Sequence, residues 1–172
     1  MMRIRTAAAV PAVALAAASL LLAAPHGAAA ARTAVCPERA LTVRAAVASA
    51  DPSVVRIDVT NRSGRACAVD RAPTVTFGDL DGAALPVPDG AAGTYRIGAG
   101  RTAYTAVRTV ADPADPQARR VAAIAVAADP GHRGRAFTAA ELGAGRAVRV
   151  WEPVTTWWQP SAAAADRAIG LS

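Results

Sequence analysis

A short stretch that ends on one of only two cysteines places the strongest constraint on this chain. Residues 54–59 alternate between apolar and polar side chains, and this period of two predicts a β-strand with one buried face. Residues 61–64 then supply Asn and Gly, which tolerate positive φ, so a turn follows the strand. Cys67 comes three residues after that turn, and the other cysteine is Cys36. The pattern predicts a strand, a turn and a covalent link back to the N-terminal part of the domain.

Composition explains why such a link matters. The 172 residues predict one domain with appendages. Hydrophobic residues make up 53% of the chain, but alanine supplies much of that fraction and aromatic residues only 4%. Each alanine buries little apolar area, and burial stabilises by roughly 25 cal/mol per Å². We therefore expect a thin core that benefits from a disulfide.

The first thirty residues have the features of a secretory signal peptide. Arg3 and Arg5 form a positive start, residues 7–24 are apolar, and residues 28–30 provide a small-residue cleavage site. A retained membrane anchor is the alternative, but the break at Pro11 and the alanine-rich exit favour cleavage. We expect a secreted, extracellular protein with no membrane span after cleavage.

Export determines how the cysteines are interpreted. In an oxidising compartment, two cysteines most simply form one disulfide, here between Cys36 and Cys67. Two cysteines and His132 make a poor ligand set, so we expect no metal and no other cofactor. Nothing near either cysteine indicates a thiol with a lowered pKa, which argues against a catalytic cysteine.

The rest of the chain consists of short β-type segments separated by Gly, Pro, Asn and Asp. An Asp81-Gly82 pair predicts a hairpin, and Pro86 predicts an edge strand beside it. Residues 121–126 fit a strand or a short helix, with β-branched residues favouring the strand. The expected strands cover residues 41–47, 54–60, 67–69, 73–77, 83–87, 94–97, 102–110, 121–126 and 146–151.

This rhythm predicts an all-β protein, because eight or nine short strands with regular turn signals are typical of a β-sandwich. Strand count alone does not separate an immunoglobulin-like sandwich from a jelly roll. The predicted organisation is a signal peptide over residues 1–30, a β-sandwich domain over residues 31–154 and a C-terminal tail over residues 155–172.

Several motifs occur in an order that resembles a known family. Cys36-Pro37 precedes Leu41-Thr42-Val43, and residues 60–64 lead to Cys67. Ala72-Pro73-Thr74-Val75 and an Asp-Gly turn come next, followed by residues 97–100 and 102–104. This order is similar to the actinobacterial secreted family named "domain of unknown function 4232", over roughly residues 36–154. The resemblance implies an immunoglobulin-like sandwich, export, and no assigned activity or catalytic residue.

The chain departs from that family at two places. Residues 71–73 are Arg-Ala-Pro where relatives have a Gly-Tyr-Pro-like segment. A second cysteine pair, present in the C-terminal half of many relatives, is missing here, as expected if its two members bond each other.

Catalysis has little support in the sequence. His132 is the single histidine after residue 30, and no Gly-x-Ser-x-Gly motif presents a nucleophile. The expected position of His132 is an exposed loop among arginines. We therefore expect a protein that is not an enzyme, although a carboxylate pair in a concave site would favour a hydrolase.

Two groups of residues are candidates for binding. Arginines bind carboxylate and phosphate through two parallel hydrogen bonds. The alternative interpretation of an arginine set is an ordinary solvated surface in a chain that has no lysine. Exposed tryptophans stack on sugars or partner proteins, although folding back onto the sandwich is slightly favoured for this pair. The candidates are Arg62, Arg65, Arg71, Arg133 and Arg135 for anions and Trp157 and Trp158 for stacking.

These features favour a non-catalytic secreted domain that binds or scaffolds in the cell envelope or medium. Removing residues 1–30 removes two arginines and no acid, which lowers the net charge from +6 to +4. That mild excess is compatible with an anionic envelope polymer or an envelope protein as partner, without specific nucleic-acid binding. The alternatives are a secreted hydrolase acting on envelope material and a structural subunit of a secreted assembly, the latter through a long unpaired edge strand or a Trp patch.

Overall fold

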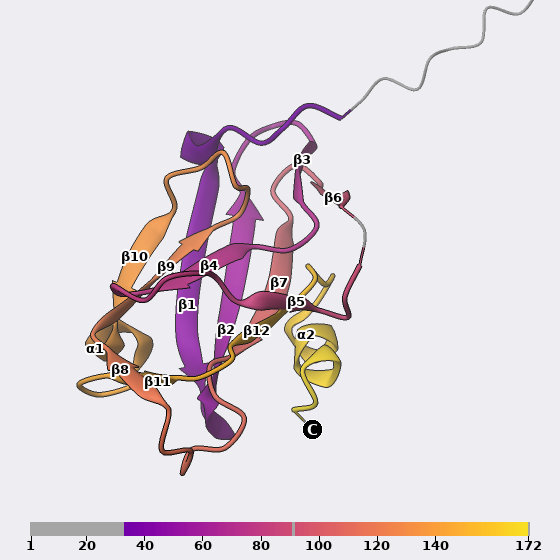
Figure 1. Cartoon of the computed structure of the whole chain (residues 1–172). Coiled ribbons are helices and arrows are strands. Elements are labelled where there is room, and N and C mark those ends of the chain that lie inside the picture. The colour runs from indigo at the N-terminus through magenta and orange to yellow at the C-terminus, as the bar shows by residue number, and fades with distance from the viewer. Residues whose placement is uncertain (1–32, 91, 172) are drawn as a thin grey trace, which may run out of the picture. The chain divides into compact units, whose positions relative to one another are not determined.

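The computed structural model describes residues 33–90 and 92–171, and the predicted signal peptide lies outside these ranges. Twelve strands and three short helices follow one another in that part (Figure 1). They are the 3₁₀ helix η1 (Glu38–Ala40), β1 (Leu41–Ala48), β2 (Asp51–Asn61), β3 (Cys67–Asp70), β4 (Thr74–Phe77), β5 (Leu85–Val87), β6 (Thr94–Ile97), β7 (Thr102–Arg108), β8 (Arg119–Val121), β9 (Ala123–Ala127), β10 (Arg135–Thr138), α1 (Ala139–Leu142), β11 (Val148–Val150), β12 (Val154–Thr156) and α2 (Ala162–Ala168).

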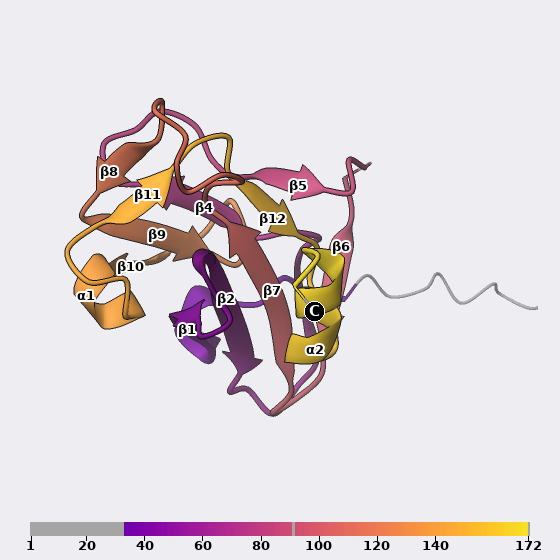
Figure 2. The same cartoon turned by 90° about the horizontal axis from the view of Figure 1, so that it is seen from below.

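The strands form two main layers. A five-stranded sheet has the order β1-β2-β7-β12-β5, and a three-stranded sheet has the order β10-β9-β4. Figure 2 shows β4 and β9 lying over one face of β2 and β7. The pairs β11-β8 and β3-β6 form two smaller sheets. The predicted all-β sandwich is confirmed, and its immunoglobulin-like subclass stays a prediction.

The alternation along β2 positions the core. Val55, Ile57 and Val59 are at most 1% exposed and pack against residues of the opposite layer, including Phe77 and Ile124. Both sheets thus bury β-branched or aromatic side chains against each other. Val121 ends β8 and residues 123–126 belong to β9, so this segment is strand and not helix.

The segment around Pro86 agrees with the prediction in one respect and differs in another. β5 is an edge strand of the five-stranded sheet, as its proline requires, because proline cannot donate a ladder hydrogen bond. The predicted hairpin at Asp81-Gly82 is wrong, since β4 pairs with β9 whereas β5 pairs in parallel with β12. The turn residues therefore carry the chain from one layer to the other.

The prediction of a C-terminal tail over residues 155–172 is also wrong. β12 inserts between β7 and β5 in the main sheet. Helix α2 then covers the face of that sheet that points away from β9 (Figure 2). Ala165 and Ile169 pack there against Val54 of β2. The helix fits because Val54 gives β2 an apolar residue on its outer face and the alanines of α2 permit close approach.

A partly exposed ion pair holds α2 in register. The Arg56 guanidinium donates to both carboxylate oxygens of Asp166, at 2.8 and 3.0 Å. Arg108 donates to the carbonyl of Ile169 at 2.8 Å and pairs with Asp51 at 3.1 Å. Bidentate pairing of this kind fixes orientation as well as distance. Residues 155–171 thus belong to the domain, and the sandwich does not end at residue 154.

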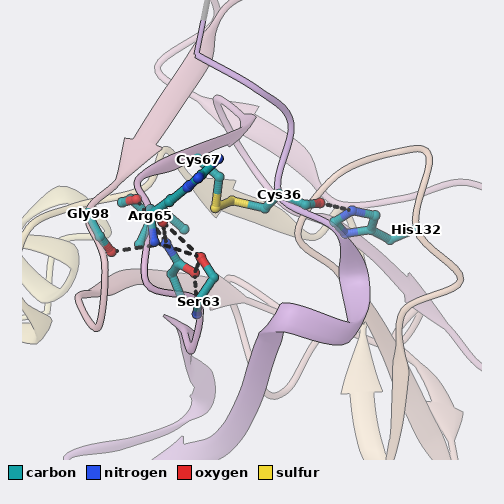
Figure 3. Close-up of a disulfide and its surroundings, with 8 residues drawn as sticks. Cys36, Ser63, Arg65, Cys67, Gly98 and His132 are labelled. Atoms are coloured by element: carbon teal, nitrogen blue, oxygen red, sulfur yellow. Dashed lines mark hydrogen bonds between the residues drawn. A yellow bond between two sulfur atoms is a disulfide. The ribbon is translucent and has the colours of Figure 1, made fainter.

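The predicted disulfide is present and joins Cys36 to Cys67 (Figure 3). The residues before it run beside β3, because the Cys36 amide donates to the Ala68 carbonyl and the Ala68 amide donates to the Ala34 carbonyl, both at 2.8 Å. On the other side, Nε2 of His132 lies 2.9 Å from the Cys36 carbonyl oxygen. The N-terminal segment is therefore fastened at three points of the sandwich.

Asn61, the single asparagine of the chain, organises the turn beside the disulfide. Its buried Nδ2 donates to the carbonyls of Arg65, Ile97 and Gly98 at 2.7, 3.2 and 3.1 Å. Its Oδ1 accepts from the amide and the hydroxyl of Ser63 at 2.9 and 2.7 Å. Asn61 is 0% exposed, so the Asn-x-Ser sequence here is not a glycosylation site of the folded domain.

We predict that replacing Cys36 and Cys67 together by serine lowers stability by about 3–4 kcal/mol, the chain-entropy cost of opening a loop with a sequence separation of 31. That is a large share of the usual total of about 5–15 kcal/mol. Thermal unfolding should show a melting temperature lower by about 10 °C. Each single variant should be at least as destabilised as the double variant, and an unchanged melting temperature would contradict the role of the disulfide.

We predict that Asn61→Asp destabilises the domain by about 1–3 kcal/mol, because a carboxylate cannot donate to the three backbone carbonyls that Nδ2 serves. Chemical denaturation of wild type and variant measures the difference. Gln117→Glu makes the same amide-to-acid change at an exposed side chain that forms no hydrogen bond with the described residues, and it should leave the midpoint unchanged. Equal denaturation midpoints for all three proteins would show that the hydrogen bonds of the Asn61 amide do not stabilise the domain.

Candidate functional site

A polar surface groove of about 560 Å³ lies where β6 passes into β7. We call it the Tyr95–Tyr104 groove. It is lined by Tyr95, Arg96, Ile97, Gly98, Gly100, Arg101, Thr102, Tyr104 and Pro160. β6 pairs with β3 and β7 pairs with β2, so the turn between them moves the chain from one sheet to another and leaves a hollow.

Glycines shape the turn at the base of this groove. Gly100 has a φ of +65°, a left-handed conformation that side chains disfavour. A Cβ atom on Gly98 would lie 2.9 Å from Cγ of Arg101, so glycine leaves the space that the Arg101 side chain occupies. The amide of Gly100 donates to the Asn61 carbonyl, and the Asn61 amide donates to the Arg101 carbonyl, both at 2.9 Å. Asn61 therefore fixes the backbone on which the groove is built.

The groove carries positive charge without a matching acid. Arg96 and Arg101 are exposed, and none of the lining residues is an aspartate or glutamate. Within the described residues, the arginines that form ion pairs with carboxylates are Arg56 and Arg108, on the outer face of the main sheet. The two groove arginines are thus available to an anion, which arginine binds through its planar fork of donors.

Two half-buried tyrosines complete the walls. Tyr95 packs against the core between the two layers. Tyr104 packs against the apolar cluster that includes Val54 of β2 and Ala165 of α2. Both tyrosines reach the groove. Burial raises the pKa of the Tyr95 hydroxyl, so it stays protonated and can donate a hydrogen bond at neutral pH. The main chain of Tyr104 also forms a pair of hydrogen bonds with Gln159, which brings Pro160 to the rim.

The arginines singled out in the sequence are held in different ways. Arg62 and Arg65 are exposed in the turn that Asn61 organises, and Nε of Arg62 donates to Thr42 Oγ1 at 3.1 Å. The Arg135 guanidinium lies 4.5 Å from the Phe137 ring centroid and donates to the Val43 carbonyl at 3.1 Å.

Arg133 is held through its backbone, and its side chain stays exposed. The amide of Arg133 donates to the Glu38 carboxylate at 3.2 Å. Of the predicted set, none lines the Tyr95–Tyr104 groove, although Arg65 shares the Asn61 hydrogen-bond network with Gly98.

The prediction of a Trp157-Trp158 stacking surface is wrong for Trp158. That side chain is 3% exposed and belongs to the main core, because the segment after β12 turns inward there. Trp157 is half-buried, with the Arg71 guanidinium 4.1 Å from its ring centroid. Gly90 packs so closely on the same ring that a Cβ atom would lie 2.4 Å from it. This cation–π contact stabilises the fold, and it means that Trp157 already stacks on a residue of its own domain.

His132 and Glu38 line a second groove, and both are engaged by main chain. Nε2 of His132 meets the Cys36 carbonyl, and the Glu38 carboxylate accepts the amides of Arg133 and Gly134. Those two hydrogen bonds hold the pKa of Glu38 below its usual value, and the bond from the Arg133 amide has the larger effect. Glu38 therefore stays ionised at neutral pH. Among the described residues, no group of three or more His, Cys, Asp or Glu side chains could hold a metal ion.

Sequence reasoning missed the residues of the Tyr95–Tyr104 groove. A signal for them was present, since a Tyr-Arg pair, a Gly-Ala-Gly turn and an Arg-Thr-Ala-Tyr run follow one another over residues 95–104.

In the part of the chain that the structure covers, no helix is long and apolar enough to cross a membrane.

Comparison with known proteins gives one match. The model of the family described as "Domain of unknown function (DUF4232)" matches residues 36–158, which include the disulfide, the Asn61 turn and all of the Tyr95–Tyr104 groove except Pro160. No curated protein and no solved structure matches the chain. The match confirms the resemblance inferred from the order of the motifs. Because it covers more than half of the chain, the protein belongs to the DUF4232 family.

Proposed function

We propose that this protein is a secreted, non-catalytic β-sandwich domain that binds anionic polymer in the cell envelope or medium. The observation that carries the proposal is the Tyr95–Tyr104 groove, which two exposed arginines and two tyrosines line together and whose lining contains no aspartate or glutamate. Such a site attracts an anion by charge and holds it through bidentate hydrogen bonds. The mild positive charge expected after export acts in the same direction.

The second groove supports binding over hydrolysis. A hydrolase of envelope material needs titratable groups free to exchange protons with a substrate. His132 and Glu38 are the titratable groups of that groove apart from Arg135, and each already forms hydrogen bonds with the backbone of the domain. We therefore assign them to fastening the N-terminal segment.

A second candidate function, a structural subunit of a secreted assembly, is favoured by β1. This strand has eight residues and lies at the edge of the five-stranded sheet, where unpaired backbone groups could accept another strand. Arg135 covers part of that edge through the Val43 carbonyl. Concentration-dependent association in sedimentation experiments, enhanced by Arg135→Ala, would favour assembly over binding.

We predict that export removes residues 1–30. N-terminal sequencing of protein from the culture medium should begin at or near Ala31, because residues 28–30 form a small-residue cleavage site. A chain found in the membrane fraction with Met1 intact would instead favour the retained anchor.

We predict salt-dependent retention of the domain on polyanion resins. At 50 mM salt, heparin and teichoic-acid columns should retain it, and a neutral dextran column should not. Affinity should fall roughly ten- to fortyfold between 50 and 200 mM salt if two or three arginines each displace a counterion. Elution of the domain with the void volume from both charged columns at low salt would contradict the proposed function.

A further inference from the structure

We infer that the Tyr95–Tyr104 groove is a binding site for an anionic saccharide, an inference that rests on the proposed function. Arg96 and Arg101 bind the carboxylate or phosphate of a sugar unit, and the tyrosines contact its ring. The site differs from the arginine and tryptophan sets that the sequence suggested.

The two arginines line the groove from the two sides of one turn. Arg96 belongs to β6 and Arg101 directly precedes β7, with the Gly-Ala-Gly turn between them. The Arg101 amide donates to the Gly98 carbonyl at 3.1 Å, which closes the turn. The Arg101 stem lies against Gly98, where a larger residue would displace it. The backbone beneath both side chains is thus fixed before a ligand arrives, which reduces the entropy lost on binding.

The tyrosines favour a sugar ring over a nucleobase. Single-stranded nucleic acids stack successive bases on exposed aromatic faces. Tyr95 and Tyr104 are half-buried, since one packs against each hydrophobic cluster, and they offer part of a ring together with a hydroxyl group. A pyranose presents the complementary surface, with apolar C–H groups beside hydroxyls.

The remaining walls fit the same ligand. Thr102 adds a hydroxyl that already lies 2.8 Å from the Thr60 hydroxyl, and exposed Pro160 adds an apolar rim. A volume of about 560 Å³ falls within the range of about 300–1,000 Å³ that is usual for small-molecule sites. That space suits one or two sugar units of a longer chain that continues into solvent.

The test compares a double variant in the groove with a matched double variant elsewhere. Arg96→Ala/Arg101→Ala removes two charges from the groove, and Arg119→Ala/Arg120→Ala removes two exposed charges from β8. Calorimetry with polygalacturonate oligomers as the carboxylate probe and phosphomannan oligomers as the phosphate probe measures affinity. We expect at least a tenfold loss for the groove variant and less than a threefold loss for the control. The probe that binds more tightly identifies the source of the anion.

Three further arms examine the sugar and the geometry. Tyr95→Leu removes the ring but keeps an apolar side chain, so it should weaken both saccharides severalfold and leave polyphosphate, which has no sugar, unchanged. Gly98→Ala keeps every charge but displaces Arg101, and it should weaken saccharide binding in a protein with an unchanged circular dichroism spectrum. Wild type should bind single-stranded DNA more weakly than either saccharide.

The outcomes separate this inference from the proposed function. If the two double variants lose affinity equally, the domain still binds polyanions but the groove assignment is overturned. Tighter binding of polyphosphate or single-stranded DNA than of the saccharides, or indifference of saccharide binding to Tyr95→Leu, overturns the sugar assignment. If wild type binds none of the charged probes, the proposed function and this inference both fall.

Discussion

The hydrogen bonds of the Asn61 side chain are the interaction on which the rest of the structure depends. One buried amide joins the turn after β2 to the turn between β6 and β7, through carbonyls at positions 65, 97 and 98. An amide suits this position because it donates and accepts at once, and it satisfies backbone groups that would be costly to bury unpaired. Cys67 begins β3 two residues beyond Arg65 and forms the disulfide with Cys36. The covalent bond and the hydrogen bonds of Asn61 therefore lie close together (Figure 3).

The same end of the molecule carries the candidate site, and this follows from the topology. β6 and β7 belong to different sheets, so the turn between them cannot be closed by a hairpin ladder and needs side-chain hydrogen bonds instead. Asn61 supplies those bonds, and the Arg96 and Arg101 side chains remain exposed on the outer side. Elsewhere, arginines are used within the domain: Arg56 and Arg108 hold α2, Arg71 packs on Trp157 and Arg135 packs on Phe137.

Much of the fold could be predicted because local patterns depend on near neighbours. The apolar alternation over residues 54–59, the turn at 61–64 and the edge position of β5 follow from side-chain period and from glycine and proline chemistry. β10 was missed because Phe137 is its single large apolar side chain and a glycine-containing loop directly precedes it. α1 was missed although Thr138 and Glu141 form a capping box, a signal visible in the sequence. The tail was misjudged because alanine favours a helix but buries little apolar area, so the sequence does not show which surface α2 covers.

The candidate site was less accessible to prediction than the fold. Charge identifies an arginine but not its neighbour, and the rings beside Arg71 and Arg135 only become neighbours once the chain has folded. The sequence by itself determined the family, the β-sandwich class and the pairing of its two cysteines, because these depend on residue order and on the absence of competing thiols. Only the tertiary structure decided that α2 covers the sheet, that Trp158 is buried and that Arg96 and Arg101 share a groove with two tyrosines. Those facts depend on contacts between residues far apart in the chain, which local patterns do not encode.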